Sequence, residues 1–209
     1  MSEPRQQPYR AVAVGVSMGG VEALRILLSG LPADFPLPLL IVHHISAAPG
    51  SNLATILNEH SALLVKEADT DEAVTPGTAY LAPPNYHLLV ERDETLALSV
   101  DPPVNFARPS VDVLFSSAAD AFGSGLIGVI LTGAGADGSQ GLKMVKERGG
   151  LAIVQDPAEA EANGMPRSAL AAVQADYVLP LRGIGPLLCR LAVQCYHEKA
   201  KYNSDNQYQ

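Results

Sequence analysis

Short apolar runs alternate along this chain with segments in which apolar residues recur at helical spacing. Five runs have the length and composition of buried strands: residues 11–16, 37–44, 126–132, 151–155 and 177–179. Helices are predicted between and after them: residues 21–31, 51–60, 110–122, 142–149, 167–174 and 184–199. This alternation predicts a doubly wound α/β fold, a three-layer sandwich whose mainly parallel sheet carries helices on both faces.

One stretch, residues 63–100, departs from this alternation because it is rich in short β-prone segments and in turn residues. Pro76-Gly77 and Pro83-Pro84 interrupt it, so we expect its short strands to form β-hairpins. No repeat and no linker divides the sequence. We therefore expect one domain over residues 11–200, preceded by a polar segment at residues 1–10 and followed by a polar tail at residues 201–209.

Composition restricts the class of protein. The 209 residues are 47% hydrophobic and 17% charged, which is typical of a globular chain. Asp and Glu outnumber Lys and Arg by 22 to 14, and this net charge of −8 argues against nucleic acid or an anionic membrane as a partner. No apolar run reaches the ~18 residues of a membrane span, and the polar start does not resemble a signal peptide. We expect a cytoplasmic protein without membrane insertion, with Cys189 and Cys195 as free thiols.

Ser17 is the first candidate for chemistry, because it follows a predicted strand of the sheet. Residues 15–19 read Gly-Val-Ser-Met-Gly, the Gly-x-Ser-x-Gly pattern of a nucleophile elbow. Small residues on both sides allow a sharp turn that exposes the hydroxyl, and backbone N–H groups after it could hold an oxyanion. A glycine turn with a helix-capping serine remains an alternative. A phosphate-binding loop is another, although the Gly-x-Gly-x-x-Gly and Gly-Lys-Ser/Thr patterns are both missing.

A serine nucleophile requires a base, and the chain has five histidines. His43 and His44 end the strand that is expected beside the first one. Adjacent strand residues point to opposite faces, so only one of the two is expected to reach Ser17. The alternative for each is a buried, hydrogen-bonded histidine. His87 follows a turn and is expected to line the cleft, whereas His60 and His197 lie near solvated helix ends.

A third group must orient the histidine and stabilise its charged form. The glycine-rich loop at residues 133–138 presents one acid, Asp137, after the strongest predicted strand. Its alternative role is that of N-cap for the following helix. Ser110 and Asp112 suit the N-cap and the first turn of the helix that begins near residue 110. The chain order Ser, His, Asp differs from the usual Ser, Asp, His of α/β-hydrolases and indicates a separate solution to the same geometry.

Six short blocks, taken together and in order, are more specific than any one motif. They are residues 15–20 (GVSMGG), 42–45 (VHHI), 76–83 (PGTAYLAP), 108–115 (RPSVDVLF), 128–133 (GVILTG) with Asp137-Gly138, and 164–167 (GMPR). In this order the chain resembles the catalytic domain of the chemotaxis protein-glutamate methylesterases (CheB-type). The resemblance extends from about residue 11 to about residue 192, so it covers nearly the whole chain.

The resemblance implies a serine esterase and assigns its catalytic residues. The nucleophile falls on Ser17, the acid on Asp137, and the base on His44, with His43 in the place of the glutamine that usually precedes it. The implied substrates are methyl-accepting chemotaxis receptors. Their glutamate methyl esters would be hydrolysed with release of methanol, and certain glutamines would be deamidated. No metal and no cofactor is required.

Other residues are expected to complete the site. The backbone N–H groups of Met18 and Ala134 are the candidate oxyanion hole. Five residues are expected to line the substrate cleft: Gly19, Gly133, Gly135, His87 and Met165. Met18 stands where the family often has threonine, and Ala134 stands where it often has methionine, so the shape of the pocket is expected to differ more than the triad does.

Two alternatives to a serine esterase follow from these departures and from the glycine turn. One is a catalytically weak or inactive binding or regulatory module of the same fold, and the other is a nucleotide-binding protein. Many relatives also carry an N-terminal receiver domain, for which the ten residues before the first strand leave no room. We therefore expect a stand-alone esterase or an excised catalytic domain. A stand-alone esterase would be constitutively active or regulated by a separate protein.

Overall fold

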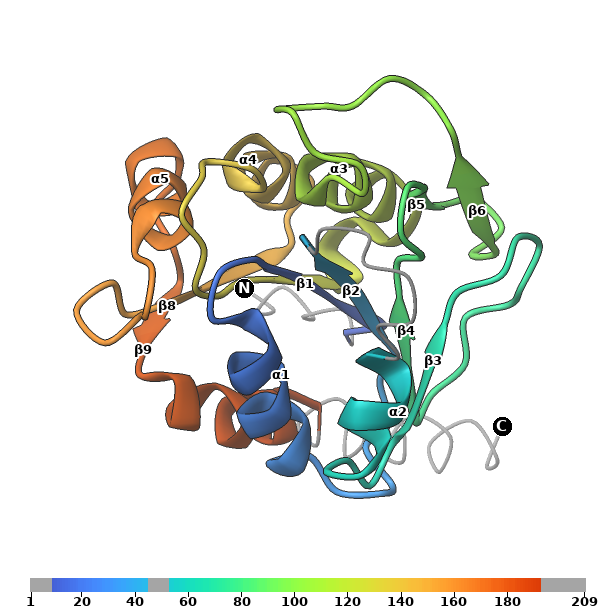
Figure 1. The fold of residues 1–209 in the computed structure, drawn as a ribbon, viewed down its shortest axis with the longest axis horizontal. Coiled ribbons are helices and arrows are strands. Elements are labelled where there is room, and N and C mark those ends of the chain that lie inside the picture. Colours follow the sequence, from blue (N-terminus) through green and yellow to red (C-terminus); the bar gives the residue numbers. More distant parts are fainter. Residues whose placement is uncertain (1–8, 45–52, 193–209) are drawn as a thin grey trace, which may run out of the picture.

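A parallel sheet forms the centre of the molecule. The computed structural model describes residues 9–44 and 53–192, and these build a seven-stranded sheet in the order β3-β4-β2-β1-β7-β8-β9 (Figure 1). Its strands are β1 (Ala11–Val16), β2 (Leu39–His43), β3 (Leu64–Glu67), β4 (Thr78–Leu81), β7 (Leu126–Ile130), β8 (Leu151–Gln155) and β9 (Tyr177–Leu179). All six strand pairs between them are parallel, which confirms the predicted sheet.

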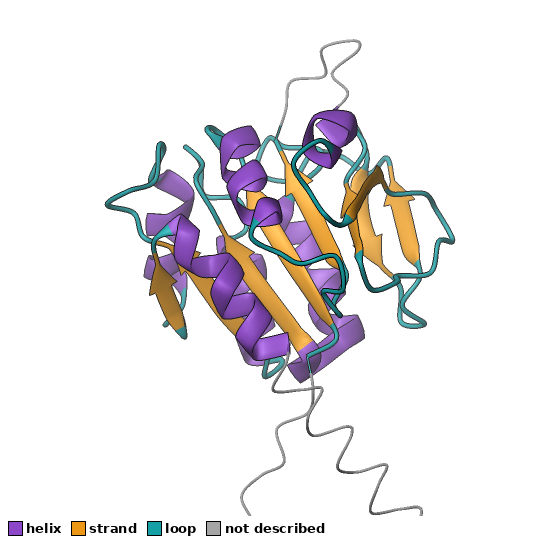
Figure 2. Ribbon diagram, turned by 90° about the horizontal axis from the view of Figure 1, so that it is seen from below, coloured by secondary structure: helices purple, strands orange, loops and turns teal. Residues whose placement is uncertain are grey.

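Helices cover both faces of the sheet, so the molecule has three layers (Figure 2). One face carries α1 (Gly20–Ser29), α2 (Leu53–Asn58) and a helix over residues 181–192. The other carries α3 (Val111–Phe122), α4 (Ser139–Glu147) and α5 (Gly164–Ala172), with a short 3-10 turn, η1 (Gly123–Gly125), after α3. Within the described residues, none of the helices has the length and apolar character that crossing a membrane requires.

The central strand β1 shows why the sheet is covered on both sides. Val12, Val14 and Val16 pack into the core on the α1 face, whereas Ala11 and Ala13 pack into the core on the α3 face. All five are fully buried. Side chains alternate between the two faces of a strand, so a strand that is apolar at every position is stable only between two layers of helices.

The stretch over residues 63–100 forms one hairpin, not several. The strands β5 (His87–Val90) and β6 (Leu96–Ser99) pair antiparallel as predicted. The expectation was wrong for β3 and β4, which pair in parallel at the edge of the main sheet. The chain between them reaches β6, where Asp71 N donates to Leu96 O at 2.8 Å and Leu96 N donates to Glu72 O at 2.8 Å. Backbone groups of this crossover are thus satisfied by the hairpin, so no crossover helix is needed.

The last helix begins three residues earlier than predicted, at residue 181 and not at residue 184. Leu181 is already buried in the core, and the weak helix formers Gly183 and Gly185 conceal this first turn in the sequence. Cys189 is a free cysteine, as expected. The predicted end of this helix, the start predicted for α2, Cys195, His197 and the two polar ends of the chain lie outside the described residues.

The strand order places three loops together at one edge of the sheet. From β1 the chain moves to β2 on one side, and it later returns to β7 on the other side of β1. The carboxyl ends of β2, β1 and β7 therefore meet where the winding of the sheet reverses direction. Ligands bind at such switch points in open α/β sheets, and these are the strands that Ser17, His44 and the loop before Asp137 follow.

Candidate active site

Ser17 lies in a tight turn between β1 and α1. Its N–H donates to Thr132 O at 2.9 Å, and its carbonyl accepts from Gly20 N at 2.8 Å. Gly19 has a φ of +74°, in the left-handed region that favours glycine, and a Cβ there would lie 2.6 Å from Glu161 Oε2. The Gly-x-Ser-x-Gly pattern thus forms the strand–turn–helix that a nucleophile elbow requires.

The loop after β7 is fastened to this elbow. The hydroxyl of Thr132 donates to Met18 O at 2.9 Å, which adds to the bond from Ser17 N to Thr132 O. Gly133 fits between the elbow and α5, because a Cβ there would clash with Met165 Sδ and lie 3.0 Å from Ser17 Cβ. A side chain at position 133 would therefore push the two loops apart.

His43 and His44 project to opposite sides at the end of β2. His43 pairs with Val16 in the parallel sheet, and the N–H of His44 donates to Val16 O at 3.1 Å. His43 Nε2 lies 3.1 Å from Ser17 O, to which it can only donate, because a carbonyl oxygen is an acceptor. Burial lowers the pKa of His43, with the hydrogen bond to Ser17 opposing the effect. His43 therefore supports the elbow as a neutral side chain.

His44 contacts the predicted acid. Its Nε2 lies 2.8 Å from Asp137 Oδ2, and the carboxylate is only 4% exposed. An ionised carboxylate only accepts hydrogen bonds, so Nε2 carries the proton and Nδ1 keeps its lone pair. Nδ1, the ring nitrogen with the lone pair, is therefore the one that can act as a base. The structure thus joins His44 directly to Asp137 and carries Ser17 on the neighbouring loop, the three residues following β2, β7 and β1. Among the described contacts, no hydrogen bond joins Ser17 to the side chain of His44.

Asp137 is held by an unusually large set of donors. Oδ1 accepts from Ser110 Oγ at 2.8 Å, from Gly138 N at 3.0 Å and from Asp112 N at 3.1 Å. Oδ2 accepts from Val111 N at 2.7 Å in addition to His44. Burial alone would raise the pKa of Asp137, but these hydrogen bonds, led by those from His44 and Val111, outweigh it and lower the pKa to about 2.

The alternative assignment of Asp137 as the cap of its own helix is wrong, and Ser110 does not cap by its side chain either. Asp137 accepts from the first N–H groups of α3, whereas α4 has Gly138 at its N-cap. Ser110 stands at the N-cap position of α3, but its hydroxyl donates to Asp137. The N-termini of α3 and α4 lie side by side, so each can be capped by a carboxylate from the other's segment.

Asp112 is the second carboxylate of this arrangement. It belongs to α3, but its Oδ1 accepts from Gly141 N of α4 at 2.7 Å, and its Oδ2 accepts from Asn105 Nδ2 at 2.7 Å. Burial raises the pKa of Asp112. The hydrogen bond from Gly141 N lowers it, but the negative charge of Asp137 raises it further, so the net shift is upward. Sequence reasoning assigned Asp112 only to the first turn of its own helix and did not find Asn105. No spacing rule relates these two residues to Asp137.

Two residues that were expected to line the cleft are buried beneath it. His87 is 1% exposed, with Nδ1 accepting from Ser110 N at 3.2 Å and Nε2 facing Pro102 O at 3.2 Å. Met165 is also 1% exposed and packs under Gly133. The turn before His87 predicted an exposed position, but α3 covers it. His87 instead holds the backbone N–H of Ser110, whose hydroxyl donates to Asp137.

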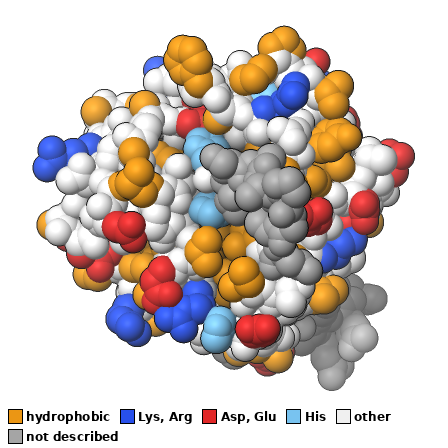
Figure 3. Space-filling view, viewed as in Figure 1, with side chains coloured by type: hydrophobic (Ala, Val, Ile, Leu, Met, Phe, Trp, Pro, Cys, Tyr) orange, Lys and Arg blue, Asp and Glu red, His pale blue; other side chains and the backbone are white. Residues whose placement is uncertain are grey.

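The open cleft lies on the Asp137 side of the elbow. It has a volume of about 380 Å³, and its lining includes His44, Asp137, Gly135 and the segment over residues 105–109. Figure 3 shows histidine side chains reaching the surface near the middle of this face, with most of the lysines and arginines toward its margin. The cleft therefore adjoins the His44–Asp137 pair.

The backbone N–H groups of Met18 and Ala134 do not donate to any other described residue. The two hydrogen bonds through Thr132 hold their loops beside each other next to Ser17. Free N–H groups in fixed positions beside a nucleophile are what an oxyanion hole requires. The exchange of side chain at positions 18 and 134 leaves such donors intact, because they belong to the backbone.

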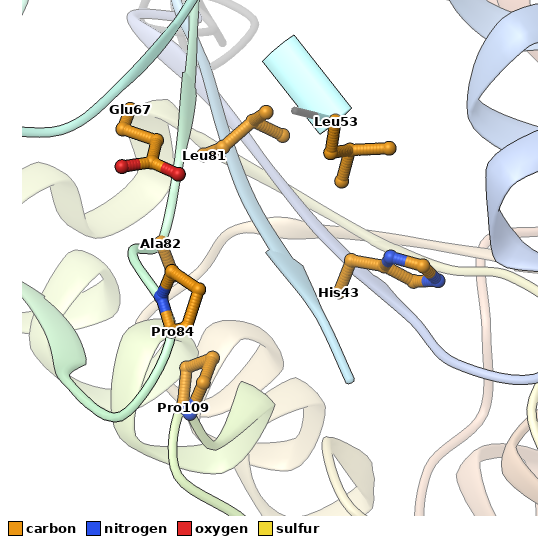
Figure 4. Close-up of a pocket in the computed structure, with 7 residues that line it drawn as sticks. All are labelled: His43, Leu53, Glu67, Leu81, Ala82, Pro84 and Pro109. Atoms are coloured by element: carbon orange, nitrogen blue, oxygen red, sulfur yellow. The ribbon is translucent and has the colours of Figure 1, made fainter. Parts of the chain in front are cut away.

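A second, smaller pocket opens on the other side of β2. Its volume is about 20 Å³, and it is lined by His43, Leu53, Glu67, Leu81, Ala82, Pro84 and Pro109. Figure 4 shows the His43 ring pointing away from the two prolines. Because a single water needs roughly 10–15 Å³ of such space, this pocket is too small for an ester side chain.

Comparison with known proteins identifies the family. The sequence profile described as CheB methylesterase matches residues 12–188. The chain belongs to the CheB methylesterase family. The crystal structure of the Thermotoga maritima CheB methylesterase catalytic domain superposes with a TM-score of 0.83 at 37% sequence identity, over 88% of this chain and 98% of that one.

Two relatives show how this CheB-family chain compares in length. A Leptospira interrogans protein, provisionally named protein-glutamate methylesterase/protein-glutamine glutaminase, is 50% identical over 88% of this chain and 95% of its own length. The Myxococcus xanthus protein-glutamate methylesterase FrzG is 44% identical over 90% of this chain, which corresponds to 56% of FrzG. The chain thus matches nearly all of the first protein and just over half of the second.

The low pKa of Asp137 predicts a loss of stability in acid. Its charged form is favoured in the folded CheB domain, so its contribution is complete above the ordinary pKa of 3.8 and is lost as the pH falls toward about 2. That shift corresponds to about 2 kcal/mol of unfolding free energy. Urea unfolding between pH 5 and pH 2 should show the stability difference between wild type and Asp137→Asn shrinking by about this amount. A difference that stays constant over this range would contradict the assignment.

Proposed function

We propose that this chain is a serine esterase that hydrolyses glutamate methyl esters on chemoreceptor proteins. The observation that carries the proposal is the 2.8 Å contact between His44 Nε2 and a buried, ionised Asp137, built on the loops that flank the Ser17 elbow. Membership in the CheB methylesterase family supports the substrate class.

In the proposed reaction the hydroxyl of Ser17 attacks the ester carbonyl, and Nδ1 of His44 takes its proton. Asp137 holds the ring in the required tautomer and stabilises its charged form. The N–H groups of Met18 and Ala134 bind the oxyanion of the tetrahedral intermediate. His44 then returns its proton to methoxide, so that methanol leaves and an acyl-enzyme remains. Water, with His44 again as base, attacks the acyl-enzyme and releases the glutamate carboxylate and Ser17.

The same residues serve glutamine deamidation, which the names of several relatives include. In that case His44 returns its proton to the departing nitrogen, and ammonia replaces methanol as the first product. The acyl-enzyme and its hydrolysis are identical. We therefore extend the proposal to receptor glutamines at positions where a methyl ester is also a substrate.

The direct test is methanol release from a chemoreceptor that has been methylated in vitro with a radiolabelled methyl group. We expect the wild-type chain to release volatile label and to restore the unmethylated mass of the receptor peptides. A receptor methylated at the same sites but incubated without the chain controls for spontaneous hydrolysis. If folded protein released no methanol above this control from receptors of several classes, the proposed function would be wrong.

A further inference from the structure

Phe106 occupies an unfavourable position at the rim of the cleft. It lies in a tight turn closed by Val104 N to Ala107 O at 3.1 Å and by Ala107 N to Val104 O at 2.9 Å. The two central residues, Asn105 and Phe106, have φ values of +51° and +64°. Asparagine tolerates this left-handed conformation, but a bulky aromatic residue rarely adopts it.

Burial does not compensate for this conformation, because Phe106 is fully exposed to solvent. A strained residue with an exposed ring contributes little to folding, since it neither satisfies the backbone preference nor removes apolar surface from water. Strain of this kind is typical of sites where a function requires a particular side chain. Phe106 therefore calls for an explanation outside the stability of the isolated chain.

The turn that carries Phe106 is hydrogen-bonded to Asp112 and Asp137 through Asn105. Asn105 Nδ2 donates to Asp112 Oδ2 at 2.7 Å and lies 3.4 Å from Asp137 Oδ1. The Arg108 guanidinium donates to Val100 O at 2.7 Å and to Asp101 O at 3.1 Å. The backbone of Phe106 is thus anchored relative to His44 and Asp137, on the loop between β6 and α3 that arches over the molecule in Figure 1.

The cleft beside Phe106 has mostly uncharged walls. Phe106, Ala107, Pro109, Gly135 and Ala136 line it together with His44 and Asp137. The cation in this lining, Arg108, is already engaged by two carbonyl oxygens. A partner that enters this cleft would meet an exposed aromatic residue and other uncharged side chains next to the His44–Asp137 pair, and aromatic residues are enriched among the hot spots of protein interfaces.

We propose that Phe106 is a docking residue for the protein substrate, which packs its ring against apolar side chains beside the esterified glutamate on a receptor helix. The inference rests on the proposed function. A methyl ester has no charge, so a receptor surface that carries the esterified side chain is less polar than the same surface with glutamate. An aromatic side chain carried by an anchored turn at the rim favours that surface and helps to align the ester with Ser17.

The test compares a protein substrate with a small one. For Phe106→Ala we expect the ratio of kcat/KM on methylated receptor to kcat/KM on a small soluble methyl ester to fall about tenfold, mainly through KM on the receptor. Val178→Ala, which removes an exposed apolar side chain on the distant strand β9, is the matched control and should leave the ratio unchanged. An unchanged ratio in Phe106→Ala, or an equal loss on both substrates, would overturn the docking role.

Two further measurements separate docking from folding and from catalysis. Phe106→Gly should show the same fall in the ratio without a lower Tm, because glycine adopts the left-handed conformation freely. Receptor binding measured in the Ser17→Ala background should weaken about tenfold when Phe106→Ala is added. If binding depends on Phe106 but no methanol is released by wild type, the proposed function fails and the docking role stands. If receptor binding is absent or does not depend on Phe106, the docking role fails.

Discussion

Ser17→Ala is expected to lower kcat for methanol release by about 10³-fold or more, with little change in KM. The hydroxyl is the attacking group in the proposed mechanism, whereas the elbow is held by backbone bonds of Ser17 to Thr132 and Gly20 that alanine keeps. Initial rates over a range of methylated receptor concentrations measure both constants. A fluorophosphonate probe should add its mass to wild type and not to the variant, because the adduct forms on the serine oxygen.

Ser29→Ala is the matched control for this experiment. Ser29 ends the same helix, α1, is exposed, and its hydroxyl donates to the carbonyl of Ile26. Its replacement should change neither the rate nor the labelling. Methanol release that continued undiminished in Ser17→Ala would show that another residue is the nucleophile and would contradict the proposed mechanism.

Asp137→Asn is expected to lower kcat by roughly 10³–10⁴-fold, although the change is nearly isosteric. The described groups that contact Asp137 donate to it, and more of them point at Oδ1 than at Oδ2. The amide oxygen would therefore take the Oδ1 position and the NH₂ group the Oδ2 position, facing His44. His44 would then accept at Nε2 and carry its proton on Nδ1, where it could no longer act as a base toward Ser17.

The amide would also face the N–H of Val111, so we expect a loss of about 1–3 kcal/mol in unfolding free energy. Nitrogen chemical shifts of the imidazole distinguish the two tautomers of His44 and so separate this cause from general disorder. Asp120→Asn, on the exposed side of α3 with Arg148 as its partner, controls for the loss of one charge. A kcat within threefold of wild type, or an unchanged tautomer, would contradict the role of Asp137.

Much of the fold followed from local patterns. The apolar run before Ser17, the helical spacing of Leu24, Leu27 and Leu28, and the glycines around both loops depend on short-range periodicity and turn chemistry. The pairing of β3 with β4 was not predictable in this way. Its crossover is stabilised by backbone bonds to β6, a strand more than twenty residues further along the chain.

The candidate site also contains residues that local sequence patterns could predict and residues that they could not. Ser17 and His44 directly follow strands, Asp137 ends the loop after β7, and the resemblance to a known family pointed to the same three positions. His87 was misjudged because a turn residue is exposed only if nothing packs over it, and α3 does so here. Asn105 and the true partners of Ser110 and Asp112 carried no local signal.

The sequence by itself therefore determined which elements form and which side chains stand at the carboxyl ends of β1, β2 and β7, because those depend on neighbours a few residues away. Only the tertiary structure decided which face His43 and His44 serve and which carboxylate caps which helix. It alone also showed that Asn105 holds Phe106 beside the cleft. The contacts that the two carboxylates and His44 make join residues 25 to 93 positions apart in the sequence. They form because close packing brings the N-termini of α3 and α4 to the edge of the sheet.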